Sequence, residues 1–234
     1  MKGLKKSLGA LAGIAMLFFL LISSFEIGAY SDYGWYEKEY AKYNVLADLE
    51  MEMTDVMQVT REMMAYLRGN RGDLVVYTIV DGEEREFFND REKAHMVDVK
   101  NLFLGGMWLR RGSLVVIGIA VLILVRTKAE WKRLLPKAFL ISMGGFIGIT
   151  LTAGLLFISD FHKYFTMFHE IFFTNDLWLL DPNTDLLIRM LPEGFFLDMV
   201  LRIGVVFLML MTFVLIISVV ILRRTNIRKT NKSI

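Results

Sequence analysis

AFLISMGGFIGITLTAGLLFIS, residues 138–159, is a run of 22 residues without a charged side chain. A helix of about 20 apolar residues is long enough to cross the ~30 Å hydrocarbon core of a bilayer. Residues 8–25 and 203–222 form similar uncharged runs of 18 and 20 residues. A fourth run, residues 112–125, has 14 and becomes long enough if its helix begins near residue 101. The sequence therefore predicts an all-α membrane protein with four transmembrane helices.

The composition of the 234 residues agrees with that class, because 55% are hydrophobic and only 22% are charged. The chain contains no cysteine. This absence excludes a disulfide framework, a thiol nucleophile and a thiolate metal site.

The charges are distributed unevenly between the runs. The stretches 1–7, 126–137 and 223–234 together hold 13 Lys and Arg but one acid. Residues 26–111 hold 17 acids and 11 bases, and residues 160–202 hold seven acids and three bases. Short basic stretches beside membrane helices stay in the cytoplasm. We therefore expect both termini and the short central loop to be cytoplasmic, and the two acidic segments to be extracellular.

The first run could also be a cleaved signal peptide, with Ala29-Tyr30-Ser31 as a weak cleavage site. Its 18 uncharged residues exceed the usual apolar stretch of such peptides and favour an uncleaved anchor. The expected organisation is a first transmembrane helix (1–30), an extracellular cap (31–100), a second transmembrane helix (101–125), a cytoplasmic loop (126–137), a third transmembrane helix (138–159), an extracellular interfacial segment (160–198), a fourth transmembrane helix (199–222) and a cytoplasmic tail (223–234).

Within the cap, helical periodicity predicts one helix over residues 35–67. A β-branched run then leads into Asp81-Gly82, a turn signal that predicts a small β-hairpin over residues 74–88. Asn89 is a good N-cap for a helix that continues directly into the second span.

Charges near the ends of the spans leave alternatives open. Arg110 and Arg111 either extend to the lipid headgroups beside Trp108 or serve a site inside the bundle. Asp198 and Arg202 are spaced for an ion pair on one helix face.

Three histidines are the main candidates for chemistry. On a helix, Glu92, His95 and Asp98 share one face. Either the two carboxylates orient the imidazole for chemistry, or the helix lies at the surface and its charges are incidental. His162 and His169 lie in residues 160–178, where seven of 19 side chains are aromatic. His169-Glu170 begins like a His-Glu-x-x-His zinc helix, but position 173 is Phe. These residues fit acid–base catalysis on an amphiphile, or a sensor or scaffold without chemistry.

Two motifs resemble the lipoprotein intramolecular transacylase (Lit) family of low-GC Gram-positive membranes. The first is REKAHMVDVK, residues 91–100. The second has FHEIFF at 168–173, Trp178, Asp181-Pro182, DLLI at 185–188 and LPE at 191–193. EYAKYNV at 39–45 and Tyr66-Leu67 are weaker marks of the same family.

The resemblance implies a transacylase that moves the sn-2 acyl chain of diacylglyceryl-cysteine to the cysteine α-amine, giving a lyso-form lipoprotein. It implies catalytic roles for His95 and His169, and it leaves His162 outside the motif, as a residue that either supports the catalytic residues or is structural. We expect supporting or substrate-binding roles for six residues: Glu92, Asp98, Tyr40, Phe168, Phe172 and Trp178.

The same resemblance implies that the active site lies at the extracellular interface of the plasma membrane. The expected partners are diacylglyceryl-modified bacterial lipoproteins and membrane lipid, without nucleic acid, metal or cofactor. An intramolecular reaction needs one copy of the chain, so we expect a functional monomer. The alternative is a non-enzymatic membrane sensor or partner-binding protein with an extracellular cap. A further one is an ester hydrolase that uses the same histidines and aromatic side chains as its pocket.

Overall fold

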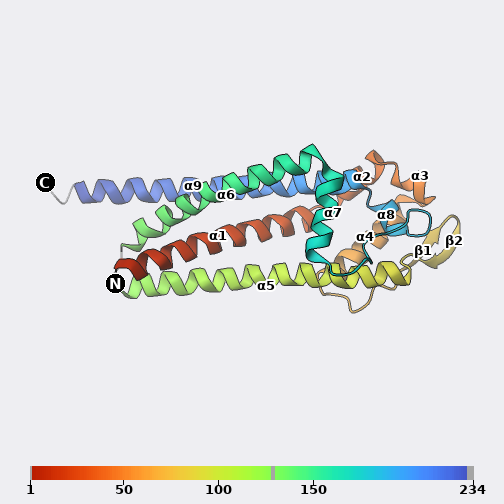
Figure 1. Cartoon of the computed structure of the whole chain (residues 1–234), viewed down its shortest axis with the longest axis horizontal. Coiled ribbons are helices and arrows are strands. Elements are labelled where there is room, and N and C mark those ends of the chain that lie inside the picture. The colour runs from red at the N-terminus through yellow and green to blue at the C-terminus, as the bar shows by residue number, and fades with distance from the viewer. Residues whose placement is uncertain (1, 128–129, 231–234) are drawn as a thin grey trace. The chain divides into compact units, whose positions relative to one another are not determined.

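A computed structural model describes residues 2–127 and 130–230 of the chain. Within these residues, four helices are long and apolar enough to cross a membrane, which confirms the predicted class. They are α1 (Lys2–Tyr30), α5 (Asp90–Arg126), α6 (Trp131–Ser159) and α9 (Glu193–Thr230) (Figure 1). The predicted loop 126–137 and tail 223–234 include positions 128–129 and 231–234, which lie outside the described residues.

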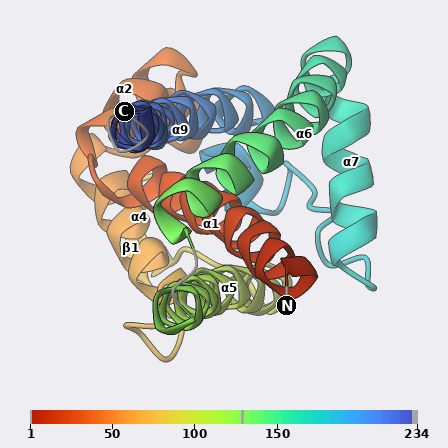
Figure 2. The same cartoon turned by 90° about the vertical axis from the view of Figure 1, so that its left-hand side faces the viewer.

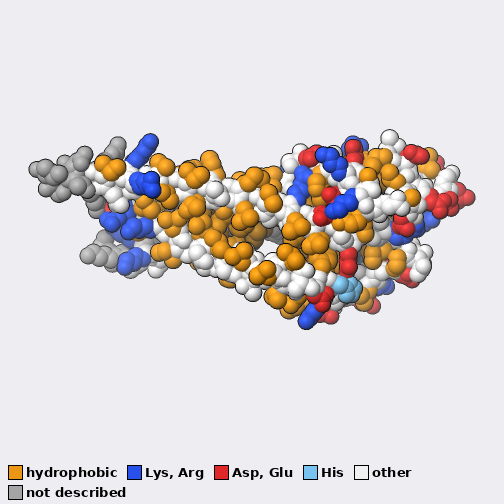
Figure 3. Space-filling model, turned by 90° about the horizontal axis from the view of Figure 1, so that it is seen from above, with side chains coloured by type: hydrophobic (Ala, Val, Ile, Leu, Met, Phe, Trp, Pro, Cys, Tyr) orange, Lys and Arg blue, Asp and Glu red, His pale blue; other side chains and the backbone are white. Residues whose placement is uncertain are grey.

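The chain forms two compact units. The first consists of the described residues of Met1–Ile27, Met107–Leu155 and Ile203–Ile234, and the second consists of Gly28–Gly106 and Leu156–Arg202. In the first unit, α1 lies between α5 and α9 (Figures 1 and 2). Apolar side chains cover much of the visible face of these long helices, and Lys and Arg gather at their end near the termini (Figure 3). This apolar surface is suited to contact with the hydrocarbon core of a membrane rather than with water.

Two contacts explain how the first unit packs. A Cβ added at Gly13 of α1 would lie 3.0 Å from backbone atoms of Ala138, so the glycine permits a close approach of α1 and α6. The side chain of Arg110 forms an ion pair with Glu26 of α1. Arg111 lies over the Trp108 ring, 5.1 Å from its centroid. The two arginines therefore have different partners, and Arg110 is neutralised inside its own unit.

The second unit begins with three helices where the sequence predicts one. Residues 35–67 form α2 (Gly34–Lys42), α3 (Val45–Leu49) and α4 (Met53–Leu67). The chain breaks at Asn44 and Glu50, which have left-handed φ values of 56° and 53°. The single-helix prediction is wrong because α2 and α4 fold back to share one aromatic and methionine-rich core. The helical spacing of apolar side chains continues across both breaks, so this spacing alone does not reveal them.

The predicted hairpin is confirmed, with shorter strands. β1 (Tyr77–Val80) pairs antiparallel with β2 (Glu83–Glu86), and Tyr77 lies opposite Glu86. Asp81 and Gly82 connect them with φ values of 54° and 73°, the positive pair that a two-residue type I′ turn needs.

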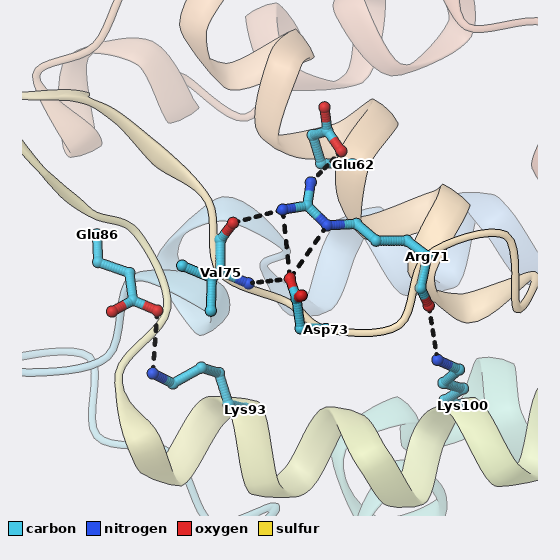
Figure 4. A network of polar contacts seen from close by, with 7 residues as sticks. All are labelled: Glu62, Arg71, Asp73, Val75, Glu86, Lys93 and Lys100. Carbon is cyan, nitrogen blue, oxygen red and sulfur yellow. Dashed lines mark hydrogen bonds and ion pairs between the residues drawn. The ribbon is translucent and has the colours of Figure 1, made fainter.

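Basic side chains of α5 attach the hairpin and the loop before it (Figure 4). Lys93 donates to Glu86 at 2.9 Å, and Lys100 donates to the carbonyl oxygen of Arg71, also at 2.9 Å. The Arg71 side chain in turn contacts Glu62, Asp73 and the carbonyl oxygen of Val75. This network fixes the first turns of α5 against their surroundings.

The second unit also contains α7 (Phe161–Phe172) and α8 (Leu186–Met190). The predicted pair of Asp198 and Arg202 at the start of α9 does not form as expected. Asp198 accepts from Tyr43 at 2.6 Å and contacts Lys42. Arg202 instead lies 3.8 Å from Asp32. Tertiary partners from the α2 region have replaced the local one.

Candidate functional site

The first turn of α5 is held by a reciprocal capping box. Asn89 Oδ1 accepts from the Glu92 backbone N–H at 2.9 Å, and the Glu92 carboxylate accepts from the Asn89 N–H at 2.7 Å. The predicted N-cap is thus confirmed. Glu92 is fully buried and its other oxygen accepts from the Leu187 N–H of α8 at 2.6 Å.

Asp185 strengthens the same connection between the two sequence motifs. Its carboxylate accepts from the Asn89 side-chain amide at 2.7 Å and from the Asp181 N–H at 2.7 Å. Burial acts to raise the pKa of Asp185, but these bonds and one from Thr184 outweigh it and lower the pKa. The motifs therefore meet through hydrogen bonds to two buried carboxyl groups, those of Glu92 and Asp185.

His95 and His169 come together beside this network. Their ring centroids are 6.2 Å apart, with 34° between the ring planes. His95 comes from α5 and His169 from α7, and only 6% and 8% of their surfaces are exposed. Two imidazoles at this separation can act on neighbouring atoms of one substrate.

Hydrogen bonding defines the tautomer of His169. Its Nδ1 lies 2.7 Å from the carbonyl oxygen of Phe165. A carbonyl oxygen only accepts, so Nδ1 carries the hydrogen and Nε2 of the neutral ring keeps a lone pair. Burial lowers the pKa of His169, and the Phe165 carbonyl opposes this with a smaller effect. His169 is therefore a neutral ring at neutral pH, and its Nε2 carries the lone pair.

His95 differs because its Nδ1 is buried without a hydrogen-bond partner among residues 2–127 and 130–230. The sequence suggests Glu92 or Asp98 as its orienting carboxylate, but the hydrogen bonds of both carboxylates go to other groups. Glu92 accepts from backbone N–H groups, and Asp98 accepts from the Asn175 amide at 2.8 Å.

Aromatic rings surround the two imidazoles. Trp178 stacks on His169 with centroids 5.0 Å apart, and Phe168 lies 5.5 Å from the same ring. Phe173 contacts both histidines, at 5.3 Å from His95 and 5.5 Å from His169. The sequence reasoning missed Phe173 and Phe165. Their spacing of four residues on either side of His169 could have indicated them.

Two of the expected supporting residues lie further out. Phe172 packs on Phe168 at 4.7 Å and is 52% exposed. Tyr40 is fully buried in the core, where its hydroxyl is hydrogen-bonded to Thr60 at 2.7 Å. The structure therefore gives Tyr40 a packing role.

His162 is separate from the histidine pair in its contacts. It is highly exposed, and its Nδ1 lies 2.5 Å from a carboxylate oxygen of Glu193. In the part of the chain that the structure describes, no group of three or more His, Cys, Asp or Glu is placed to hold a metal ion. The two imidazoles themselves offer proton transfer and hydrogen bonding.

Comparisons with known proteins point to one family. A family model described as lipoprotein intramolecular transacylase Lit matches residues 10–196. The in meso structure of the membrane integral lipoprotein intramolecular transacylase Lit from Bacillus cereus has a TM-score of 0.71 at 20% identity, covering 99% of this chain and 100% of that chain. Among curated proteins, none matches.

Two further structures are variants of that Bacillus cereus protein, with a histidine replaced by arginine or by alanine. Both have a TM-score of 0.75 at 19% identity and cover 97% of this chain. They cover 96% and 97% of their own chains. At these identities the likeness concerns the fold.

Proposed function

The chain belongs to the lipoprotein intramolecular transacylase (Lit) family, and from this premise we propose that it moves the sn-2 acyl chain of diacylglyceryl-cysteine to the α-amine of that cysteine. It is an enzyme, an acyltransferase that acts on lipoproteins. The observation that carries the finer proposal is the meeting of two buried histidines, one from each motif.

The reaction closes an eight-membered ring inside the substrate. From the amine nitrogen the path runs through Cα, Cβ, sulfur, two glycerol carbons and the ester oxygen to the carbonyl carbon. A new N–C bond forms as the ester C–O bond breaks. The amine loses one proton and the glycerol oxygen gains one, so the reaction is balanced. The enzyme must supply geometry and proton transfer. Orientation of such flexible reactants is worth up to ~7–11 kcal/mol in favourable cases.

We assign the role of base to His169. Its Nε2 has the lone pair because Nδ1 donates to Phe165, and its lowered pKa keeps the ring neutral. The nitrogen accepts the amine proton during attack and returns it to the departing glycerol oxygen, which restores the starting state.

His95 takes the complementary role. As a neutral ring it carries one N–H, which donates to the carbonyl oxygen as negative charge develops there. The position of its ring beside His169, with centroids 6.2 Å apart, supports this assignment. Phe173 contacts both rings and therefore packs against the pair.

The membrane placement is part of the proposal. The charge asymmetry of the sequence supports cytoplasmic termini and a histidine site at the extracellular interface of the plasma membrane. Ile171 and Phe172 on α7 are 65% and 52% exposed, which suits a helix that rests on lipid. An intramolecular reaction on a membrane-held lipoprotein supports action as a monomer, without a cofactor.

The pH dependence of transfer follows from these assignments. The rate requires a neutral amine, of reference pKa about 7.7–8.0, and a neutral His169, whose pKa lies below the ordinary 6.5. Between pH of about 6.5 and 7.5 only the amine limits the rate, so log rate should rise by about one unit per pH unit. Below the pKa of His169 the slope should approach two. A slope of two that persists to pH 7 would contradict a lowered pKa.

Tandem mass spectrometry of the N-terminal lipopeptide of a lipoprotein tests the proposed activity in cells. Intact mass is uninformative, because migration within one molecule gives an isomer. Cells with the protein should show N-acyl, mono-O-acyl cysteine, and cells without it should show diacylglyceryl-cysteine with a free amine. Released fatty acid without an amide would instead indicate an ester hydrolase.

A further inference from the structure

The segment of residues 174–178 between α7 and α8 is attached to α5 at two points. Asn175 Nδ2 donates to Asp98 at 2.8 Å. The Arg91 side chain donates to the carbonyl oxygen of Asp176 at 2.5 Å. Arg91 and Asp98 are seven residues apart, about two helical turns, so they hold the segment along one face of α5.

Contacts within the segment pass this restraint to Trp178. The indole N–H of Trp178 donates to the carbonyl oxygen of Asn175 at 2.9 Å. The Asn175 side-chain oxygen accepts from the Leu177 N–H at 3.1 Å. The same asparagine thus bonds Asp98 with its amide nitrogen and sets the orientation of the indole with its backbone.

Trp178 in turn covers one face of His169. The two rings are stacked at 5.0 Å with 30° between their planes. The Phe165 carbonyl holds the imidazole at its Nδ1 edge, and the indole prevents it from tilting about that bond. The position of Nε2 toward a substrate therefore depends on both.

We propose that Asp98 is a positioning residue for His169, acting through Asn175 and Trp178. The inference rests on the proposed function, in which His169 is the base. It differs from the reading of the sequence, in which Asp98 serves His95 on its own helix. The contacts favour the new assignment, because the Asp98 carboxylate is hydrogen-bonded across to the segment that carries Trp178.

Two substitutions at one position separate a hydrogen-bonding role from a role of charge. Asp98→Asn keeps a carbonyl oxygen that can accept from Asn175 but removes the negative charge, and Asp98→Ala removes both. We expect Asp98→Ala and Asn175→Ala to lower kcat about ten- to a hundredfold with little change in KM, because misplacement of a base impairs the chemical step. Asp98→Asn should recover most of that loss. Asp90→Ala is the matched control, since Asp90 is an exposed α5 carboxylate that pairs with Lys93.

A spectroscopic readout makes the test independent of turnover. In a full-length variant with Trp35, Trp108 and Trp131 replaced by Phe, Trp178 is the sole tryptophan. A protonated imidazole stacked on an indole quenches its fluorescence, so acidification should quench Trp178. The quench should disappear in the His169→Ala variant, and this disappearance would identify His169 as the quenching group. Among residues 2–127 and 130–230, His95 is the other titratable ring in contact with His169, so the His169→Ala variant is needed to tell the two apart.

The quench should also weaken in Asp98→Ala and Asn175→Ala, and persist in Asp98→Asn. An unchanged quench in Asp98→Ala, or an Asp98→Asn variant as impaired as Asp98→Ala, would overturn the proposal. A failure of the transacylase proposal would appear elsewhere, as an His169→Ala variant that retains transfer.

Discussion

Alanine in place of His169 or His95 is expected to reduce acyl transfer about 10²–10⁴-fold, because a positioned acid–base group contributes about that much. The loss should appear in kcat, since the histidines act on the reacting atoms and the aromatic walls remain. Purified variants in detergent, given a diacylglyceryl lipopeptide, allow the rate to be measured directly.

His162→Ala is the matched control for this pair. It removes an imidazole from the same helix as His169, but that ring is exposed and contacts Glu193. We expect its transfer rate to stay within a few-fold of the parent. Near-normal turnover by His169→Ala or His95→Ala would show that the proposed role of that histidine is wrong.

Glu92→Ala should lower the free energy of unfolding more than a substitution of an exposed side chain does. The substitution leaves two N–H groups without an acceptor, those of Asn89 and the buried Leu187. A buried donor left unsatisfied costs about 1–3 kcal/mol, and loss of the capping interaction adds to it. We therefore expect a loss of about 2–4 kcal/mol in the free energy of unfolding, measured by denaturant or thermal unfolding in detergent.

The contrast with an exposed carboxylate makes this result specific. Glu170→Ala on α7 changes an exposed side chain and should shift stability by no more than about 0.5 kcal/mol. Glu92→Gln should be intermediate, because one amide oxygen can still accept a bond. Equal stability of Glu92→Ala and the parent would contradict the account of how the two motifs are joined.

The parts of the fold that local sequence determines were predictable. The length of an apolar run predicts a membrane helix whatever other helices pack against it. The dipeptide Asp81-Gly82 likewise predicts a tight turn without any tertiary contact. The break of the 35–67 helix was not predictable, because the left-handed residues Asn44 and Glu50 accompany the packing of α2 and α4 into one core. Helix propensity does not include the free energy that tertiary packing contributes.

The site shows the same division. Helical spacing correctly placed Glu92, His95 and Asp98 near one another but paired the carboxylates with the nearest imidazole. Their actual partners, Leu187 and Asn175, are remote in sequence. The meeting of the two histidines likewise depends on tertiary contacts, and a family resemblance implied it where spacing did not.

The most direct test of the central claim is a transfer reaction with a position-specific label. A synthetic diacylglyceryl lipopeptide carries a deuterated acyl chain at sn-2 and an unlabelled chain on the other glycerol carbon. It is incubated with the purified protein, and with His169→Ala, and fragmented by tandem mass spectrometry. The account predicts that the deuterated chain moves to the cysteine nitrogen with the parent protein and stays on glycerol with the variant. Label that remains on glycerol with active, folded parent protein, or an unlabelled chain on nitrogen, would contradict it.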